Sequence, residues 1–464
     1  LNTNFLFFFF IYIKYSLIIY IIKMSFVDLI PVVEKTSVKV AIRIRPLNDR
    51  EYNSNPITEI INNTILLINP EDKKKNAAEK KVEQNILRIL FAGGGSGGHI
   101  NPILAVSEAL REMMPQLKMN LILRHLGPQD SHTEVLKAAN IETTFLLGAK
   151  WRRYASLKNI LDIPLFFVSI LQAFIKLLLF MPDVIFSKGG PGSLPVVLVG
   201  WFYRIPIIIH ESDSVPGVSN AISARFATRI AVSFERAKNY FPPKKTALTG
   251  TPINPILLAG PLAQKTAKEV MGFDPNEPVI LIIGGSQGAQ SINEFIVTNL
   301  EDITNITQVI HQTGTANFSE IQRLSRAAMI EISTKDALPK RYHAVPYLKS
   351  EDIKNALSAA DLVVSRSGSG SLFEIAAFKK PAILIPLQNS GRDHQRLNAY
   401  EFAKSGGAVI IEQSNLMSGI FMNQIKEILE NPAVKETMSQ GSGSFFIPNA
   451  AQIVAQEILK IAHK

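Results

Sequence analysis

Two segments of the chain, about 190 residues apart, share the order apolar strand, glycine-rich turn, helix. The first has a strand at 86–92 and five glycines between positions 93 and 98. The second has a strand at 279–283 and a glycine turn at 284–288. Further strand and helix signals alternate between and after them, which is typical of α/β proteins with parallel sheets. We therefore predict two doubly wound, Rossmann-like domains that face a central cleft, with ligands at the carboxyl ends of the strands.

The composition excludes several classes of protein. With 464 residues, 47% of them hydrophobic and 19% charged, the chain is neither disordered throughout nor a single small module. It has no cysteine, which rules out a disulfide scaffold, a thiolate zinc site and a cysteine nucleophile. The formal net charge is +10, which suggests an anionic partner.

The first 85 residues differ from the rest. Residues 1–23 are strongly apolar, carry only the charges of Lys14 and Lys23, and are long enough to span a bilayer. The chain begins with Leu, and its first methionine is Met24. Two interpretations therefore stay open for this segment: a membrane anchor, or upstream sequence read through in translation.

A short alternating segment at 37–51, SVKVAIRIRPLNDRE, resembles the first strand of a kinesin motor. A motor also needs the phosphate-binding string G-x-x-x-x-G-K-[ST], which occurs nowhere in the sequence. We therefore predict that residues 24–85 are a kinesin-like fragment followed by a linker rich in Lys and Glu, and not an ATPase.

From about residue 86 to the end, the chain resembles the MurG-type N-acetylglucosaminyltransferases of peptidoglycan synthesis. A single glycine turn is a weak signal, but several motifs in the right order over about four fifths of the chain are specific. The motifs are GGGSGGHINP (93–102), SKGGPGSLPVV (187–197), HESDSVPG (210–217), GTPIN (250–254), GGSQGA (284–289), SRSGSGSLFEIAAF (365–378) and DHQRLNA (393–399).

The resemblance implies a glycosyltransferase-B architecture and an inverting transfer of N-acetylglucosamine. The donor is UDP-N-acetylglucosamine, the acceptor is a muramyl pentapeptide on undecaprenyl diphosphate (lipid I), and the product is lipid II. We place an acceptor-binding, membrane-facing domain at 86–250, a domain that binds the UDP-sugar at 251–446, and a C-terminal helix at 447–464 that packs back on the first domain. We expect no metal and no cofactor, so helix N-termini and backbone N–H groups would stabilise the leaving diphosphate.

An inverting transfer needs a base near the acceptor hydroxyl. His99 follows the first glycine turn at the expected start of a helix, where the positive end of the helix dipole lowers the pKa of an imidazole. The resemblance makes His99 the candidate base, and the alternative is a histidine that only caps the helix. Glu211 and Asp213, in HESDS, stay open as base or acceptor-side partners.

The resemblance places donor contacts at both glycine turns and in the later motifs. Ser286 and Gln287 are expected at the donor diphosphate, the alternative for Ser286 being a simple N-cap. Glu374 is expected to accept the ribose hydroxyls, the alternative being a first-turn glutamate that answers the helix dipole. The expected substrate-binding residues are Ser96, Gly97, Gly98, Asp213, Asn254, Ser286, Gln287, Gly288, Leu348, Ser371, Glu374, His394 and Gln395.

Within this set, His394 and Gln395 match positions that hold the sugar, and the backbone near Leu348 is expected to meet uracil. One position departs from the family pattern: the GTPI-x loop usually ends in Arg and here ends in Asn254. An amide replaces neither the charge nor the fork geometry of a guanidinium. Either donor affinity falls or Arg366 compensates.

Residues 150–183 combine an apolar run with basic residues. Pro164 interrupts the run and Lys176 lies inside it, so we do not expect a spanning helix. An apolar surface with a basic rim suits docking on anionic lipid headgroups, the alternative being a core helix pair. The basic residues are Lys150, Arg152, Arg153, Lys158 and Lys176.

These features predict a peripheral enzyme on the cytoplasmic face of the cell membrane, with no nucleic-acid partner. Two other functions stay open: a UDP-sugar epimerase of the same architecture, and a non-catalytic UDP-sugar-binding protein associated with a membrane. Acceptor-dependent release of UDP separates the transferase from both.

Overall fold

The structure is a computed structural model, and the chain in it divides into two compact units. One unit holds residues 1–85 and 178–181, and the other holds residues 86–177 and 182–464. The kinesin-like segment at 37–51 and the apolar segment at 1–23 lie outside the described residues. The structure describes residues 58–61, 64–67, 86–94, 97–129, 133–147, 157–190, 192–285, 288–332, 341–388 and 390–462.

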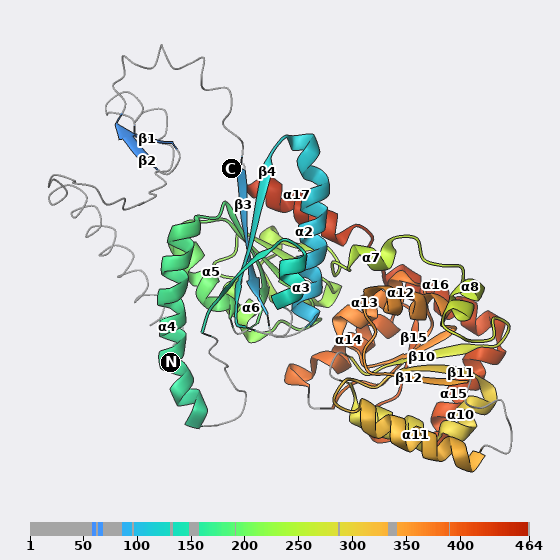
Figure 1. The fold of residues 1–464 in the computed structure, drawn as a ribbon. Helices are drawn as coiled ribbons and strands as arrows, with labels where there is room; N and C mark the ends of the chain where they lie inside the picture. Colours follow the sequence, from blue (N-terminus) through green and yellow to red (C-terminus); the bar gives the residue numbers. More distant parts are fainter. Residues whose placement is uncertain are drawn as a thin grey trace. The chain divides into compact units, whose positions relative to one another are not determined.

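In the smaller unit, two described strands, β1 (Thr58–Ile61) and β2 (Thr64–Leu67), form an antiparallel pair. The larger unit contains two parallel sheets with helices packed around them (Figure 1). We refer to residues 86–177 and 182–248, together with the end of the helix that continues to residue 180, as the first half, and to residues 255–445 as the second half.

The described part of the first half has a seven-stranded sheet in the order β5-β4-β3-β6-β7-β8-β9, with every pairing parallel. Strands β6 and β7 are buried along their whole length, so their sequences are mostly apolar instead of alternating. The strands are β3 (Ile86–Gly93), β4 (Asn120–Gly127), β5 (Glu142–Phe145), β6 (Val184–Gly189), β7 (Ile207–Glu211), β8 (Arg229–Val232) and β9 (Thr246–Leu248). The helices are α2 (Gly97–Leu117), α3 (Thr133–Ala138), α4 (Leu157–Phe180), α5 (Ser193–Phe202) and α6 (Val218–Ser223).

The described part of the second half has a six-stranded sheet in the order β12-β11-β10-β13-β14-β15, again parallel throughout. The strands are β10 (Val279–Ile283), β11 (Gln308–Gln312), β12 (Tyr342–Val345), β13 (Leu362–Ser365), β14 (Ala382–Leu384) and β15 (Ala408–Ile410). The helices are α7 (Pro255–Leu258), α8 (Gln264–Val270), α9 (Gln290–Thr298), α10 (Leu300–Ile306), α11 (Phe318–Ile332), α12 (Ser350–Ala359), α13 (Ser369–Ala377), α14 (His394–Ala403), α15 (Ser418–Glu430) and α16 (Pro432–Phe445).

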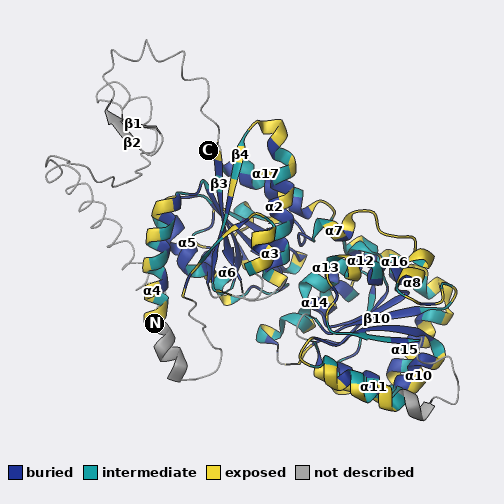
Figure 2. Cartoon of the chain, in the orientation of Figure 1, coloured by how far each residue is buried: buried dark blue, intermediate teal, exposed yellow. Residues whose placement is uncertain are grey.

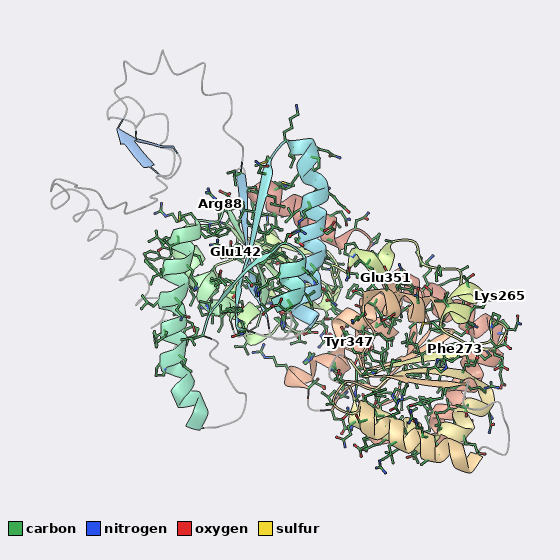
Figure 3. The ribbon with its side chains drawn as sticks, in the orientation of Figure 1. Arg88, Glu142, Lys265, Phe273, Tyr347 and Glu351 are labelled. Atoms are coloured by element: carbon green, nitrogen blue, oxygen red, sulfur yellow. The ribbon has the colours of Figure 1, made fainter. Side chains whose placement is uncertain are left out.

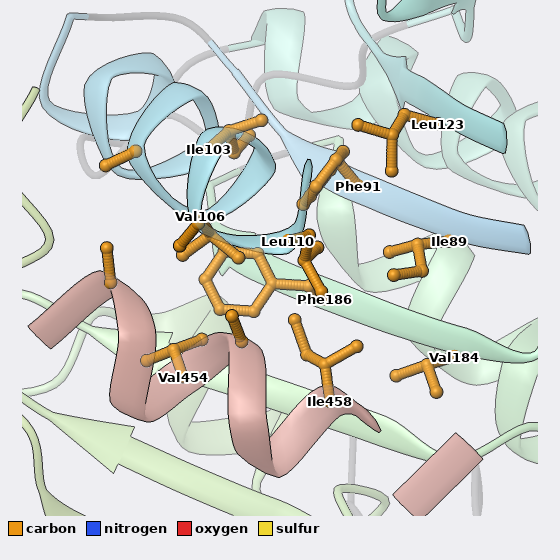
Figure 4. Close-up of a cluster of buried hydrophobic side chains, with 14 of the residues drawn as sticks. Ile89, Phe91, Ile103, Val106, Leu110, Leu123, Val184, Phe186, Val454 and Ile458 are labelled. Carbon is orange, nitrogen blue, oxygen red and sulfur yellow. The ribbon is translucent and has the colours of Figure 1, made fainter. Parts of the chain in front are cut away.

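Each sheet lies at the centre of its own hydrophobic core, with exposed residues on the outer faces of the helices (Figure 2). The C-terminal helix α17 (Ala450–Ala462) joins the core of the first sheet, where Val454 and Ile458 pack with Val106, Leu110 and Phe186 (Figure 4). The last helix of the chain therefore belongs to the packing of the first half. The predicted architecture, two parallel-sheet Rossmann-like domains, is confirmed.

Helix α4 runs from Leu157 to Phe180, so the helix itself continues through Pro164, which interrupts only the apolar run of the sequence. A proline removes one backbone hydrogen bond and crowds the preceding turn, but Pro164 is exposed, and the turns after it continue to Phe180. Among the described helices, none is both long enough and apolar enough to cross a membrane.

Candidate active site

The first glycine turn connects β3 to α2. Gly93 and Gly94 have φ of 139° and 154°, a conformation that residues other than glycine rarely adopt. His99 lies in the first turn of α2, and a Cβ added to Gly190 would lie 3.6 Å from its Nε2. The imidazole therefore lies against the backbone that follows β6, at the carboxyl ends of two adjacent strands. Ser96 lies outside the described residues, and Gly97 and Gly98 are the first two residues of α2.

A second histidine supports this turn. His125 in β4 is buried, and its Nε2 donates to the carbonyl oxygen of Gly93 at 2.7 Å. His125 was not predicted as a site residue. In the sequence it follows Arg124 in the same strand, so the pattern does not single it out.

Glu211, the last residue of β7, is buried and accepts three hydrogen bonds with its carboxylate. The donors are the backbone N–H of Asp213, the backbone N–H of Gly217 and the amide of Asn220, each at 3.0 Å. Burial, followed by the charge of Asp213, raises the pKa of Glu211. This carboxylate shapes the loop 212–217, which we call the HESDS loop after the motif at 210–214 that leads into it. Most of the positions at which the carboxylate can accept a hydrogen bond are occupied.

Lys188, near the end of β6, is a buried cation that the sequence analysis missed. Its ammonium donates to the hydroxyl of Ser212. Burial lowers the pKa of Lys188 to about 8, against the opposing effect of the charges on Glu211 and Asp213. Lys188 and these two carboxylates thus form one charged group beneath the HESDS loop.

The HESDS loop also meets the second half of the unit. Asp213 Oδ1 accepts from Nδ2 of Asn398 at 2.9 Å, and the backbone N–H of Ser214 donates to Oδ1 of the same asparagine at 2.8 Å. The structure therefore joins two motifs that lie 185 positions apart in the sequence.

The second glycine turn connects β10 to α9, which begins at Gln290. Gly288 has φ of 79°, and a Cβ there would lie 2.2 Å from the carbonyl oxygen of Thr313, so only glycine fits. Ser286 and Gln287 lie outside the described residues, which leaves their predicted contacts as predictions.

Gln312 links this turn to the predicted uracil position. Its Nε2 donates to the carbonyl oxygen of Gly285 at 3.2 Å, and its Oε1 accepts from the backbone N–H of Leu348 at 3.0 Å. Gln312 is buried at the end of β11 and was not selected from the sequence. The Leu348 N–H is thus occupied by a side chain of the protein.

Glu374 lies on α13, one turn after Gly370, and Ser371 lies between them in the first turn of this helix. Burial raises the pKa of Glu374 to about 7. The pKa of Tyr347 is raised by burial and also by the charge of Glu374, so the two groups are neighbours; Figure 3 labels this tyrosine. Among the described residues, no donor forms a hydrogen bond with Glu374 that would favour its ionised form.

His394 and Gln395 begin α14 and follow a strained turn, the 3-10 segment η6 (Gly391–Asp393). Arg392 and Asp393 have φ of 56° and 55°, a left-handed conformation that is costly for residues other than glycine. His394 Nδ1 lies 2.7 Å from the carbonyl oxygen of Gly391, and Gln395 Oε1 accepts from the N–H of Leu387 at 3.0 Å. The backbone strain fixes where this helix starts and therefore where both side chains lie.

Asn254 has a clear local role. It is the N-cap of α7, where its Oδ1 accepts from Ile256 N at 3.1 Å and its Nδ2 donates to Ser350 Oγ at 3.0 Å. An arginine could not cap the helix in this way. Arg366 donates to the carbonyl oxygens of Ile385 and Pro386 and to Ser291 Oγ, all within the second half, so its guanidinium supports the fold there.

Among the described residues, no group of three or more His, Asp or Glu side chains could hold a metal ion. The chemistry available here is that of carboxylates, imidazoles, glycine turns and helix N-termini, gathered at the carboxyl ends of two parallel sheets. Such an arrangement suits a nucleotide-linked anionic substrate.

Comparison with known protein families agrees with this arrangement. Residues 89–232 match the glycosyltransferase family 28 N-terminal domain, and residues 279–454 match the glycosyltransferase family 28 C-terminal domain. Each match contains one of the two parallel sheets. The kinesin-like segment lies outside both matches, and its resemblance to a kinesin has no support.

Two curated relatives align along most of their length. The chain is 34% identical over 351 residues to the UDP-N-acetylglucosamine–N-acetylmuramyl-(pentapeptide) pyrophosphoryl-undecaprenol N-acetylglucosamine transferase 2 of Bacillus thuringiensis subsp. konkukian. The aligned region covers 75% of this chain and 94% of the relative. It is 33% identical over 375 residues to the corresponding transferase of Clostridium botulinum strain Alaska E43, with 80% and 98% covered.

Solved structures show the same fold. MurG of Acinetobacter baumannii is 26% identical, with a TM-score of 0.59 and coverage of 81% of this chain and 99% of that one. A UDP-GlcNAc 2-epimerase from Neisseria meningitidis has the same TM-score but only 16% identity, so this second likeness concerns the fold alone. Sequence identity separates the two classes, and the chain belongs to the MurG-type N-acetylglucosaminyltransferases of glycosyltransferase family 28.

Proposed function

We propose that this chain transfers N-acetylglucosamine from UDP-N-acetylglucosamine to lipid I, giving lipid II. The observation that carries the proposal is the 34% identity to a transferase of this name over 94% of its length. In the reaction, the acceptor hydroxyl oxygen bonds to the anomeric carbon while the bond from that carbon to the UDP oxygen breaks. The hydroxyl proton passes to a base, UDP leaves, and the anomeric configuration inverts.

His99 and Asp213 are the proposed base candidates. His99 lies at the N-terminus of α2 beside the first glycine turn, and Asp213 carries its carboxylate on the HESDS loop. Glu211 is less suited, because its carboxylate already accepts three hydrogen bonds that hold that loop. We infer a supporting role for Glu211 and leave proton abstraction to the other two.

The leaving diphosphate would be stabilised by the two glycine turns and the helices that follow them. Helices α2 and α9 begin directly after these turns, and a helix N-terminus offers backbone N–H groups and a positive dipole end. Backbone donors that are already in place need no rearrangement as negative charge develops, which is how such sites lower a barrier. Ser286 and Gln287 stay in the proposed set as side-chain contacts of this diphosphate.

The proposed donor site lies in the second half. Glu374 would accept the two ribose hydroxyls, and Gln395 would donate its amide to the sugar while its Oε1 stays bound to Leu387. At the uracil position, the base must compete with Gln312 for the N–H of Leu348. Asn254 acts by capping α7 and does not supply a charged contact with the UDP-sugar.

We propose that α4 docks this enzyme on the cytoplasmic face of the cell membrane. Phe167, Leu171 and Ile175 follow one another at intervals of four, which places them on one face of the helix, and they are 49%, 61% and 51% exposed. Such a stripe suits the boundary between headgroups and acyl chains. Replacing all three with serine should abolish cosedimentation with vesicles that contain anionic lipid, while turnover of a soluble acceptor analogue persists. Unchanged cosedimentation would contradict this docking site.

The function itself is tested by incubating the intact chain with UDP-N-acetylglucosamine and a lipid I analogue. UDP release that depends on the acceptor supports the transferase. Formation of an epimer without acceptor would instead support the epimerase, and binding without turnover would support a non-catalytic protein.

A further inference from the structure

Asn398 is a buried amide of α14 with its hydrogen-bonding groups engaged. Its side chain is 0% exposed. Oδ1 accepts from the backbone N–H of Ser214 at 2.8 Å, and Nδ2 donates to Asp213 Oδ1 at 2.9 Å and to the carbonyl oxygen of Ser367 at 3.3 Å. The amide therefore uses both its donor group and its carbonyl, and two of its three partners belong to the HESDS loop.

The position of Asn398 on α14 connects this loop to the proposed sugar site. His394 and Gln395 begin the helix, and residues three and four positions later lie on the same face. A second contact comes from Arg392, just before the helix, whose guanidinium donates to the carbonyl oxygen of Pro216 at 2.9 Å. One helix and its preceding turn thus hold the HESDS loop at the Asp213 side chain, the Ser214 backbone and the Pro216 backbone.

The contacts of the loop divide by what they fix. Glu211, from the first half, accepts from the backbone N–H groups of Asp213 and Gly217 and so sets the path of the main chain. Asn398, from the second half, binds the carboxylate of Asp213 itself and also accepts from the backbone N–H of Ser214. Removing Asn398 would release the direction of the Asp213 carboxylate and the N–H of Ser214, while Glu211 still holds the backbone at Asp213 and Gly217.

We propose that Asn398 is a positioning residue: it aims the Asp213 carboxylate and ties the acceptor-side loop to the helix that carries the sugar-binding residues. This inference rests on the proposed function. It predicts that Asn398 affects turnover through Asp213 and not through donor binding.

A double-mutant cycle on the full chain tests this coupling. Asn398→Ala should lower kcat by about 100-fold, as a misplaced reactive group does, and leave the Kd for UDP-N-acetylglucosamine within about threefold. In an Asp213→Ala background, adding Asn398→Ala should change kcat by less than about threefold, because the group that it positions is already gone. Effects that multiply in the double variant would overturn the inference.

Gln308→Ala is a matched control for loss of a buried amide. Gln308 begins β11, at the end of the strand opposite to the site, and hydrogen-bonds with the backbone N–H and carbonyl of Asp274 at 2.8 and 2.9 Å. This variant should lower Tm as Asn398→Ala does but keep kcat. A loss of kcat as large as that of Asn398→Ala would show that kcat follows stability alone and would overturn the inference.

A swapped pair keeps the test open if Asn398→Ala does not fold. In Asp213→Asn with Asn398→Asp, the amide at 213 donates to the carboxylate at 398, which still accepts from Ser214 but no longer donates to the carbonyl oxygen of Ser367. We expect Tm to return towards the wild-type value while kcat stays low, because the carboxylate now lies on α14. Wild-type kcat in the swapped pair would overturn the inference.

A wild-type chain without acceptor-dependent UDP release would overturn the proposed function and this inference together, whereas the other outcomes concern Asn398 alone.

Discussion

The two halves of the larger unit hold their key carboxylates in different ways. In the first half, Glu211 is buried, accepts three hydrogen bonds and lies near the buried Lys188. In the second half, Glu374 is partly buried, and burial raises its pKa to about 7. A carboxylate whose acceptor positions are filled by the protein supports the fold, whereas one that lacks donors is suited to receive them from a ligand. We therefore propose a structural role for Glu211 and a donor-binding role for Glu374.

The largest expected effect concerns the buried cation of the first half. Lys188→Met should lower the free energy of unfolding by about 3 kcal/mol, because two carboxylates lose the positive charge nearest to them in a buried site. Denaturant unfolding measures this change. Lys265→Met is the control, since Lys265 is exposed in the second half, labelled in Figure 3, and should show less than about 0.5 kcal/mol. Equal stability of the two variants would contradict a structural role for Lys188.

The same substitution in the two halves should give different results. Glu211→Gln replaces one accepting oxygen with a donor that faces the loop N–H groups, so we expect a loss of about 2 kcal/mol in the free energy of unfolding. Glu374→Gln should leave stability unchanged or slightly higher at pH 8, because it removes a charge that burial disfavours. Unfolding of both variants under one set of conditions checks the pair, and equal losses would remove the distinction between the halves.

Donor binding should depend on pH through Glu374. In the proposed donor site, ribose hydroxyls would donate to the ionised carboxylate, so binding would lower its pKa, and affinity should rise as pH increases towards the unliganded pKa of about 7. If only the ionised form binds, the Kd for UDP-N-acetylglucosamine should be about tenfold weaker at pH 6 than at pH 8. Calorimetry across this range measures the dependence, and Glu374→Gln should bind more weakly and show a flat profile. A steep profile in Glu374→Gln would assign the titration to another group.

The smallest expected effect lies in the segment that begins the second half. Asn254→Ala should cost about 1 kcal/mol of stability through loss of the N-cap, and Asn254→Asp should cost less because it can still accept from Ile256. Thermal unfolding of the two variants checks this order. The reverse order would contradict the capping role and would favour a contact between Asn254 and the UDP-sugar.

The sequence predicted the fold well because its signals were local. The strands at 86–92 and 279–283 and the glycine turns after them are runs of adjacent residues, and the observed β3 and β10 agree with them within one residue. Pro164 interrupts the apolar run of the sequence, but α4 continues through this proline. Local sequence patterns predict reliably where helices and strands form, but they do not predict whether a helix continues through one unfavourable residue.

The supporting residues of the site were harder to predict. Asn398 stood in a quoted motif, but its contact with Asp213 joins positions 185 apart, and no periodicity shows such a pair. Lys188 is the next-to-last residue of β6 and Gln312 is the last residue of β11, and each follows another polar residue, so the sequence pattern does not single them out. Their functions depend on which strands lie side by side, and that follows from the tertiary structure.

The stereochemistry of the product is the most direct test of an inverting transfer. We would incubate the intact chain with UDP-N-acetylglucosamine, whose sugar is α-linked, and a lipid I analogue, and assign the new linkage by NMR. An inverting transferase gives a β-linked N-acetylglucosamine on the muramyl residue, with UDP formed in equal amount. An α-linked product, or conversion of the donor to its epimer without acceptor, would contradict the proposed function.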